Sequence, residues 1–461
     1  MSKTYRAYNP EQQLLMPPSL HEWLSEDHLA YFVSDTIDEM DLSAIESFYE
    51  KNLRGNPPYH PTMMVKILFY AYCTGTFSSR KIAMKLVDDV AFRMLAAGNR
   101  PDFRTISDFR KLHLSALKGL FVQVLMLCEK AGMVKLGHVA LDGTKLKANA
   151  SKHKAMSYGR MKAESARLES EISKLLESAQ LADDAEDKEL GDDVRGDELP
   201  EELSFRKSRL AKIRQAMNEL EAEAKAEAAE DSVASEANEP ADKPVNKSGR
   251  PKKQSIGVPE DKAQKNFTDP ESKIMMSADK SFIQGYNAQT AVDSGYQVIV
   301  ATMLTNNGAD SPHTEAVVDR IEAICGKLPE EMSLDAGYYS EKNVKYLESK
   351  KIDTYMPPCR LKHREYRDAV AQPITEDSSI KDRMKSKVLT DEGRKKYGLR
   401  KKTAEPVFGQ IKECRGFRRF SMCGIEKCEG EWNLVCATHN LLKLFRHGAA
   451  SKLKQAMECM E

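Results

Sequence analysis

The sequence lacks an uninterrupted apolar run of about 18 residues, the length with which a helix can cross a membrane. Residues 1–30 also lack the apolar stretch and small-residue cleavage site of a secretory signal. Nine cysteines are spread from Cys73 to Cys459 without a closely spaced framework, which is typical of reduced, packed thiols. We therefore expect a cytoplasmic protein without a membrane partner.

The sequence has no net charge either, because 70 Lys and Arg balance 70 Asp and Glu. This balance hides two unequal segments. Residues 161–240 hold 11 basic and 23 acidic residues, whereas residues 381–447 hold 17 basic and 8 acidic residues. Such a basic block is typical of a protein that binds a phosphate backbone, although an ordinary solvated surface gives the same pattern.

A chain of 461 residues is longer than the roughly 250 to 300 residues at which a single hydrophobic core stops growing, so we expect several domains. The residue patterns change at four points along the chain. They divide it into residues 1–135, 136–154, 155–270, 271–447 and 448–461.

Residues 1–135 are predicted to be all α. The expected helices run from Pro61 to Gly75, from Arg80 to Leu86, from Asp88 or Asp89 to Gly98, and without a break from Thr105 to about Lys130. Arg80, Arg104 and Arg110 lie near helix starts, which suits a helix-turn-helix DNA reader. The alternative is a helical bundle that only packs on the next domain.

Residues 155–270 interrupt the chain with a different composition. Met161–Ala179 and Leu203–Ala229 are rich in Ala, Glu, Lys and Leu, with narrow apolar stripes that predict an antiparallel helical hairpin or coiled coil. Residues 183–200 read as an acidic linker between the two helices. Residues 232–262, with Pro240, Pro244, Pro251 and a basic patch, read as disordered.

The segments on either side of this insertion have an α/β pattern. Val139–Leu141 is a short predicted strand that ends at Asp142. The later elements are a hairpin of 282–292 and 296–304, a helix of 314–324, a strand of 332–334 that ends at Asp335, a helix of 341–349, and a strand of 354–356. Thr403 is expected to cap a helix with Glu405 and Pro406 in its first turn, and a last helix spans 429–445.

Asp142, Asp335 and Glu405 are the candidate catalytic and metal-binding residues. They converge only if the two strands are neighbours in one sheet and the helix packs beside them. Mg²⁺ prefers oxygen ligands, and two such ions can clamp the attacking and leaving oxygens of a phosphoryl displacement. Each acid taken alone also fits the common occurrence of Asp and Glu at strand ends and helix starts.

Further charged residues follow a regular spacing around Glu405. Tyr397, Arg400, Glu405 and Lys412 are separated by two, four and six residues. Seven residues make almost two helical turns, so Glu405 and Lys412 are expected on one helix face about 10 Å apart. Arg400 can add a bidentate contact to a DNA phosphate. An ordinary amphipathic helix with solvated charges remains the alternative.

Several short strings together resemble the bacterial insertion-sequence transposases of the DDE class. They are Val139-Ala-Leu-Asp-Gly-Thr-Lys-Leu-Lys-Ala148, Gly285-Tyr-Asn-Ala-Gln289, Leu334-Asp-Ala-Gly-Tyr338, the Tyr397 to Lys412 spacing, and Arg104-Thr-Ile-Ser-Asp-Phe-Arg110. Each string is weak alone. Their order along the chain makes the resemblance specific.

This resemblance implies an α/β ribonuclease H-like catalytic domain in residues 136–154 and 271–447, an all-α N-terminal DNA-binding domain in 1–135, and a helical or coiled-coil insertion in 155–270. It implies that Asp142, Asp335 and Glu405 bind two Mg²⁺ ions, for which Mn²⁺ can substitute. Tyr397, Arg400 and Lys412, with Arg80, Arg104 and Arg110, are the expected DNA contacts. The expected partners are the terminal inverted repeats, target DNA and a second copy of the chain on DNA, in the nucleoid.

Other interpretations remain open at this point. A protein that binds DNA without catalysis, or a nuclease that cuts without joining, has the same fold. Cys414, Cys423, Cys428 and His439 suggest zinc, but no Cys-x-x-Cys pair is present and packed thiols are preferred. Trp432 can stack on a base, although its apolar neighbours favour a core position.

Overall fold

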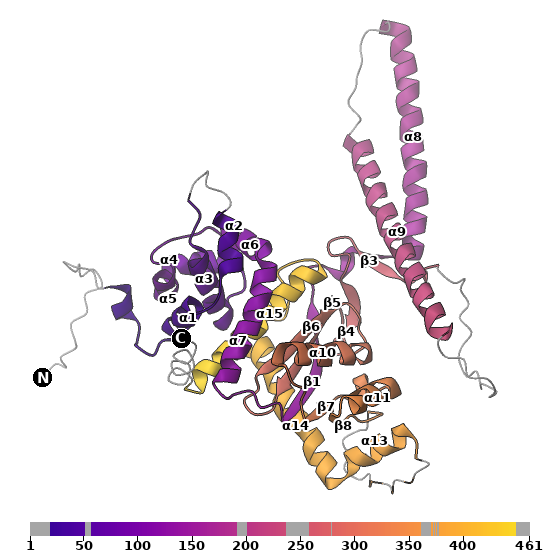
Figure 1. The fold of residues 1–461 in the computed structure, drawn as a ribbon. Coiled ribbons are helices and arrows are strands. Elements are labelled where there is room, and N and C mark those ends of the chain that lie inside the picture. The colour runs from indigo at the N-terminus through magenta and orange to yellow at the C-terminus, as the bar shows by residue number, and fades with distance from the viewer. Residues whose placement is uncertain are drawn as a thin grey trace, which may run out of the picture.

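The computed structural model describes residues 19–50, 57–190, 201–236, 258–277, 279–360, 370–371, 373, 375 and 378–448. It contains a group of N-terminal helices, a mixed sheet covered by helices, and a two-helix arm that projects from the sheet (Figure 1). No single helix in the described ranges has the length and apolarity to cross a membrane. Only the bent α6–α7 pair passes that test, by length and composition alone.

The N-terminal helices confirm most of the predicted helix starts. They are α1 (Leu29–Asp38), α2 (Ser43–Glu50), α3 (Pro61–Cys73), α4 (Ser79–Asp88), α5 (Val90–Leu95), α6 (Phe103–Leu112) and α7 (Leu114–Lys130), after a 3-10 turn η1 (Leu20–Trp23). Pro61 opens α3, where its missing N–H costs no helical hydrogen bond. Asp89 caps α5 by accepting hydrogen bonds from the backbone N–H groups of Ala91 and Phe92.

The predicted continuous helix from Thr105 to Lys130 is wrong. The chain bends by 75° between α6 and α7, at His113. His113 has left the helical region, with φ −109° and ψ 23°, and its buried imidazole contacts the Tyr49 hydroxyl at 3.0 Å. The bend thus falls at a buried polar side chain with a tertiary contact, within a segment whose apolar spacing is helical throughout.

The central sheet has the strand order β4-β5-β1-β7-β8, and β6 pairs with β5 beside β4. The strands are β1 (His138–Lys147), β4 (Lys273–Met276), β5 (Phe282–Asp293), β6 (Ile299–Thr305), β7 (Glu331–Leu334) and β8 (Asp353–Tyr355). β1, β7 and β8 are parallel, whereas β5 is antiparallel to β1, β4 and β6. The sequence did not predict β4, a short strand whose Ile274 and Met276 are exposed.

The strand that carries Asp142 is longer than predicted. β1 continues through Lys147, so Asp142 lies in the middle of the strand and the prediction that it ends there is wrong. The cause is β5, which pairs with β1 as far as Lys147 opposite Gly285. Glycine is required at 285 because a Cβ there would collide with the Leu146 carbonyl oxygen.

Within the described residues, five helices pack around the sheet. They are α10 (Thr314–Cys325), α11 (Glu341–Ser349), α13 (Ile380–Leu389), α14 (Asp391–Gly409) and α15 (Ile425–Arg446). α10 packs on β5 and β6, and α14 packs on β1, β5, β7 and β8. α15 contacts β6 and also α3 and α7, so one hydrophobic core runs from the N-terminal helices into the sheet. Trp432 on α15 is fully buried there, which confirms its predicted core position.

The predicted start of the helix around Glu405 is wrong. α14 begins at Asp391, with Thr390 as its N-cap, and Glu405 and Pro406 lie in its last turns. Pro406 has no N–H for the Lys402 carbonyl oxygen, which would normally cost the helix a hydrogen bond. Gln297 supplies the missing donor, with its Nε2 2.7 Å from Lys402 O. A side chain from outside the helix thus lets a proline lie inside it.

The insertion forms an arm with its own small core. β2 (Ala155–Ser157) pairs with β3 (Gln264–Asn266) at its base, and α8 (Tyr158–Leu190) packs on α9 (Glu201–Glu236) through residues that include Met161 and Ile213. α8 includes 183–190, which we predicted as linker, and α9 includes 232–236, which we predicted as disordered. Residues 191–200 and 237–257 of those predictions, and the predicted tail after Gly448, lie outside the described residues. Residues 258–262 of the predicted disordered segment are described and lead towards β3.

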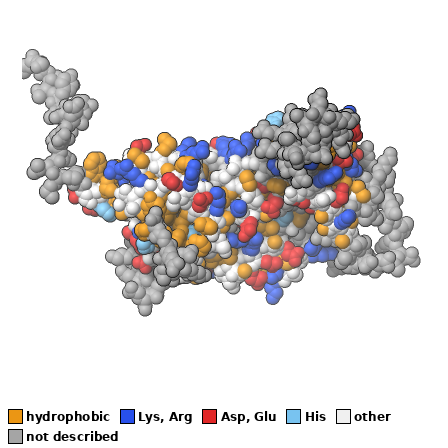
Figure 2. All heavy atoms as spheres, turned by 90° about the horizontal axis from the view of Figure 1, so that it is seen from above, with side chains coloured by type: hydrophobic (Ala, Val, Ile, Leu, Met, Phe, Trp, Pro, Cys, Tyr) orange, Lys and Arg blue, Asp and Glu red, His pale blue; other side chains and the backbone are white. Residues whose placement is uncertain are grey.

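On the face seen in Figure 2, Lys and Arg side chains occur along the length of the body with Asp and Glu side chains among them. Residues 381–447 carry the basic excess found in the sequence. In this segment some cations are paired within the protein, as Lys387 is with Asp353 and Arg418 with Glu413. We infer that local contacts rather than summed charge determine which cations are available to a partner.

Candidate active site

The sheet brings the two predicted aspartates to neighbouring positions. Parallel pairing of β1 and β7 ends with Leu141 opposite Leu334, so Asp142 and Asp335 are the next residues of the two segments. Asp142 accepts a hydrogen bond from the Gly143 N–H at 2.9 Å. Asp335 accepts one from the Ala336 N–H at 2.8 Å and starts a 3-10 turn, Ala336–Tyr338. The end of β7 therefore places two carboxylates together.

Arg400 on α14 connects Asp142 with the third predicted acid. Its Nη1 lies 2.9 Å from Asp142 Oδ2, and its Nη2 lies 3.6 Å from Glu405 Oε1. The Arg400 and Asp142 side chains are only 12% and 16% exposed, whereas that of Glu405 is 53% exposed. The fold thus gathers the three predicted acids around one largely buried guanidinium.

The electrostatics of this site are dominated by burial and by the excess of acids. Burial raises the pKa of Asp142 to about 6, and the nearby charges of Asp335 and Glu405 act in the same direction against Arg400. Burial alone would lower the pKa of Arg400, but the charges of Asp142, Asp335, Tyr397 and Glu405 together more than offset it, and the pKa is raised. One cation among three carboxylates leaves the site short of positive charge.

Tyr397 and Lys412 also reach this site, but not along one regular helix. The Tyr397 ring centre is 5.9 Å from the guanidinium carbon of Arg400. Between Glu405 and Lys412 the helix changes to a π-helical segment, η5 (Gln410–Cys414), so the spacing expected from regular turns does not apply. Lys412 Nζ donates to Thr144 Oγ1 and to Lys145 O on β1. Lys412 is thus held against the strand that carries Asp142.

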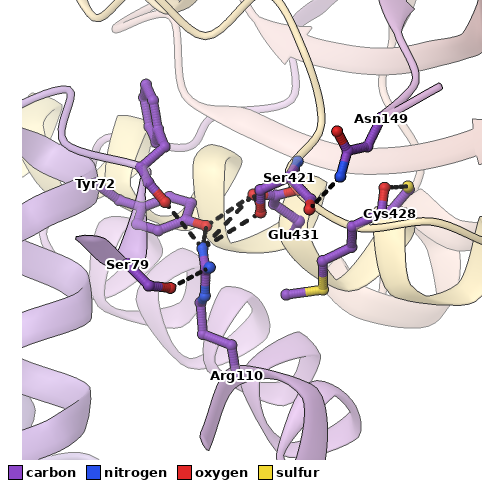
Figure 3. Close-up of polar contacts among 9 residues, drawn as sticks. Tyr72, Ser79, Arg110, Asn149, Ser421, Cys428 and Glu431 are labelled. Atoms are coloured by element: carbon purple, nitrogen blue, oxygen red, sulfur yellow. Dashed lines mark hydrogen bonds and ion pairs between the residues drawn. The ribbon is translucent and has the colours of Figure 1, made fainter. Parts of the chain in front are cut away.

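The prediction that Arg110 contacts DNA is wrong in this structure. Arg110 is 4% exposed, and its guanidinium donates to Tyr72 Oη at 2.9 Å and Ser79 Oγ at 2.7 Å. It lies 3.8 Å from the fully buried carboxylate of Glu431, which also accepts from Ser421 Oγ (Figure 3). Arg110 joins the N-terminal helices to α15, because burying a cation requires partners of this kind.

Arg80 and Arg104 differ from Arg110 because both are exposed. Their guanidinium carbons lie 5.1 Å and 5.8 Å from the ring centre of Phe103, which is itself 37% exposed. Both cations are therefore free to meet solvent, and an aromatic ring fixes their positions. Their predicted role in DNA binding stays a prediction.

The described residues contain no group of three or more His, Cys, Asp or Glu side chains close enough to hold a metal ion. Neither the residues of the zinc alternative nor the set of Asp142, Asp335 and Glu405 forms such a group in this structure. Cys428 Sγ donates to the Met422 carbonyl oxygen, and the buried His439 contacts Gln410 and Gln297. These residues are packing elements of α15.

Sequence reasoning did not identify a polar cluster behind the two aspartates, formed by Asp310, Lys145, Asn287, Gln289 and Tyr338. Gln289 and Tyr338 occur in the quoted strings, but nothing in the sequence connects them with Asp310. Asp310 follows β6 in a loop where single acids are common. Only the pairing of β1 with β5 brings these side chains together.

Comparison with known families matches two separate parts of the chain. A family model described as Transposase domain (DUF772) matches residues 18–112, within the N-terminal helices. A model described as Transposase DDE domain matches residues 355–445, which include Tyr397, Arg400, Glu405 and Lys412. Asp142 and Asp335 lie outside both matches. No curated protein and no solved structure matches the chain.

Proposed function

Because this chain is a DDE-class transposase of the insertion-sequence type, we propose that it cuts DNA at the ends of its element and joins those ends to target DNA. We propose Asp142, Asp335 and Glu405 as the catalytic acids. The observation that carries the proposal is their convergence from β1, β7 and α14 around Arg400. Isolated strand-end and helix acids would not be expected to meet in this way.

The sheet supports a ribonuclease H-like catalytic domain. In the order β6-β5-β1-β7-β8, the strands β6, β5 and β1 alternate in direction, and β7 and β8 run parallel to β1. This is the order expected for such a core, with the insertion between its first and second strands. We propose residues 136–154 and 271–447 as the catalytic domain, 155–270 as the insertion and 1–135 as a DNA-binding domain that shares its core with the catalytic one.

The chemistry of the site fits a divalent metal, which is typical of the family. Its donors are carboxylate oxygens, the ligands that Mg²⁺ and Mn²⁺ prefer, and Arg400 alone does not balance them. Asp142 and Asp335 would hold the metal, with Glu405 completing the set. Bound there, two ions would activate the attacking oxygen and stabilise the charge that develops on the phosphate.

The proposed reaction has two displacements at phosphorus. Water attacks the phosphodiester at the element end, and the P–O3′ bond breaks to release a 3′-hydroxyl. That hydroxyl attacks a target phosphodiester, so one P–O bond forms and another breaks without an external energy source. Both steps need the same alignment, because attacking and leaving oxygens lie in line.

The chain's own cations bind and orient the DNA in this proposal. The Arg400 guanidinium, held by Asp142 and 3.6 Å from the half-exposed Glu405, places a cation where a DNA phosphate bound beside Glu405 would lie. Lys412, fixed on Thr144, places a cation beside the strand of Asp142. Arg80 and Arg104 bind the element end through phosphates. Pairing of two ends requires a second copy of the chain on DNA.

A plasmid assay tests this function. Supercoiled plasmid carrying the ends that flank the gene is incubated with Mg²⁺ and either wild type or Asp335→Ala. We expect cleavage and strand transfer with wild type and neither with the variant, while gel-shift binding is unchanged. Equal activity would overturn the catalytic assignment. Cleavage without transfer of pre-cut ends would identify a nuclease, and binding without either step would identify a non-catalytic DNA-binding protein.

A further inference from the structure

Asp310 occupies a defined place relative to the two aspartates of the proposed active site. It lies in the loop between β6 and α10, and its side chain is 25% exposed. Oδ1 accepts hydrogen bonds from Lys145 Nζ at 3.0 Å, Asn287 Nδ2 at 2.8 Å and Gln289 Nε2 at 2.9 Å. One partly buried loop residue thus organises side chains from β1 and β5.

Lys145 and Asp142 lie on opposite faces of β1, because side chains alternate along a strand. Asp142 meets Arg400 of α14, whereas Lys145 meets Asp310. The Asp310 cluster therefore supports the catalytic strand from the face opposite Arg400.

Two glycines next to the proposed catalytic acids make room for the Asp310 carboxylate. A Cβ on Gly143, the residue after Asp142, would lie 3.0 Å from Asp310 Oδ1 and 2.6 Å from Gln289 Nε2. A Cβ on Gly337, two residues after Asp335, would lie 3.2 Å from Asp310 Oδ2. Each oxygen of one carboxylate thus packs against the backbone that carries one of the two acids.

A second connection runs through Tyr338. Its hydroxyl donates to Gln289 Oε1, and both side chains are buried. Tyr338 ends the 3-10 turn that Asp335 begins, and its own carbonyl oxygen is held by Asn343 Nδ2 at 2.8 Å. The chain from Asp310 through Gln289 to Tyr338 therefore fixes the C-terminal end of the turn that Asp335 begins.

We propose that Asp310 is a positioning residue that sets the relative placement of Asp142 and Asp335 for divalent metal binding. This inference rests on the proposed function, because it assigns Asp310 a role in that same site. Asp310 itself touches neither substrate nor metal. It acts through the Gly143 and Gly337 backbones and through Gln289 and Tyr338.

Metal binding by the full-length protein without DNA tests this role. Mn²⁺ alone is the probe, titrated and followed by electron paramagnetic resonance. The variants are Asp310→Asn, which keeps the shape but removes the charge that pairs with Lys145, and Tyr338→Phe, which removes only the hydroxyl. Glu315→Gln is the matched control, since Glu315 also pairs with a lysine, Lys342 at 3.3 Å, but in the first turn of α10.

We expect Asp310→Asn to weaken Mn²⁺ binding by about 10- to 100-fold, the effect typical of removing a group that orients metal ligands. Tyr338→Phe should weaken it less, and the double variant should bind no more weakly than Asp310→Asn, because both changes break one chain of contacts. Glu315→Gln should bind like wild type. The Asp310→Asn melting temperature should stay near that of wild type.

Wild-type affinity in Asp310→Asn would overturn the inference, as would an equal loss in Glu315→Gln. If Asp310→Asn does not fold, Tyr338→Phe decides, and wild-type affinity in that variant overturns the inference. If the proposed function is wrong, the result is different. Asp142→Asn would then bind as much Mn²⁺ as wild type does. In that case the role of Asp310 falls with it.

Discussion

The replacement Asp142→Asn should make the metal-free protein more stable at neutral pH, although Asp142 is a proposed catalytic residue. The Asp142 carboxylate is largely buried beside Asp335 and Glu405, and these surroundings raise its pKa from 3.8 to about 6. An asparagine of the same shape keeps one acceptor oxygen for either Arg400 Nη1, now on Oδ2, or the Gly143 N–H, now on Oδ1, and the loss of the other acceptor subtracts from the gain. The asparagine avoids the cost of burying an additional negative charge.

The size of the effect follows from linkage. A folded-state pKa about two units above the unfolded value corresponds to about 3 kcal/mol, at about 1.4 kcal/mol per unit. The raised pKa means that the protonated form is favoured in the folded state. The penalty is therefore absent below pH 3.8, grows as the pH rises towards about 6, and is complete above it. Asp142→Asn should show its full gain, up to about 3 kcal/mol, at pH 7.5.

Thermal melts in EDTA at pH 4, 5, 6 and 7.5 measure this difference. The melting temperature of Asp142→Asn should exceed that of wild type by a few degrees at pH 7.5, and the gap should close towards pH 4. Addition of Mg²⁺ should raise the wild-type melting temperature and leave the variant nearly unchanged. A variant that melts below wild type at pH 7.5, or a gap independent of pH, would refute the reasoning.

Asp293→Asn is the matched control for this experiment. The Asp293 carboxylate, on β5, accepts hydrogen bonds from the backbone N–H groups of Lys135, Leu136 and Gly295 at 3.2, 2.8 and 2.8 Å. In an asparagine, the NH₂ group would replace one of the two acceptor oxygens. At least one of the backbone N–H groups would then face another donor. The same replacement should therefore lower the melting temperature, opposite in sign to Asp142→Asn.

Three further predictions concern the rest of the chain. Arg110→Met should cost about 3 to 5 kcal/mol in denaturant melts, because Glu431 would stay buried without its cation, and an unchanged midpoint would contradict the role of this pair. Arg80→Ala and Arg104→Ala should each reduce the slope of log binding constant against log salt concentration by about one, measured by fluorescence anisotropy, without changing the melting temperature. A loss of affinity confined to one DNA sequence would argue against phosphate contacts. Replacing residues 158–263 by a short Gly-Ser linker should preserve the main thermal transition seen by circular dichroism. Ser157 and Gln264 are cross-strand partners that a short linker can join, and the arm has its own core. Aggregation of this variant would show that the arm stabilises the rest of the protein.

The predictable part of the fold is that governed by local pattern. Pro61, Asp89 and Ser340 mark helix starts through backbone preferences that act within a few residues, and all three do so in the structure. The positions of Asp142 and Asp335 next to each other required only that two apolar segments pair in parallel. The family resemblance added the order in which these segments occur.

The errors arose where a distant residue overrides the local pattern. Pro406 reads as a helix start, but Gln297 supplies the donor that its interior position lacks. His113 breaks an apolar repeat because its ring contacts Tyr49. The sequence around Arg110 predicts a surface cation, yet Arg110 is buried beside Glu431, which is more than 300 residues away along the chain. No window of sequence contains both members of these pairs.

The single core that joins the N-terminal helices to the sheet has a consequence for how such proteins can diversify. A recognition domain on a flexible linker can be exchanged whole between relatives. Here α3 and α7 pack on α15, and the Arg110–Glu431 pair closes their junction, so a transplanted N-terminal segment would arrive with an unmatched buried charge and unfilled core. If the N-terminal helices bind the element end as proposed, new end specificity is therefore expected to evolve through substitutions at their exposed positions, rather than by shuffling of domains.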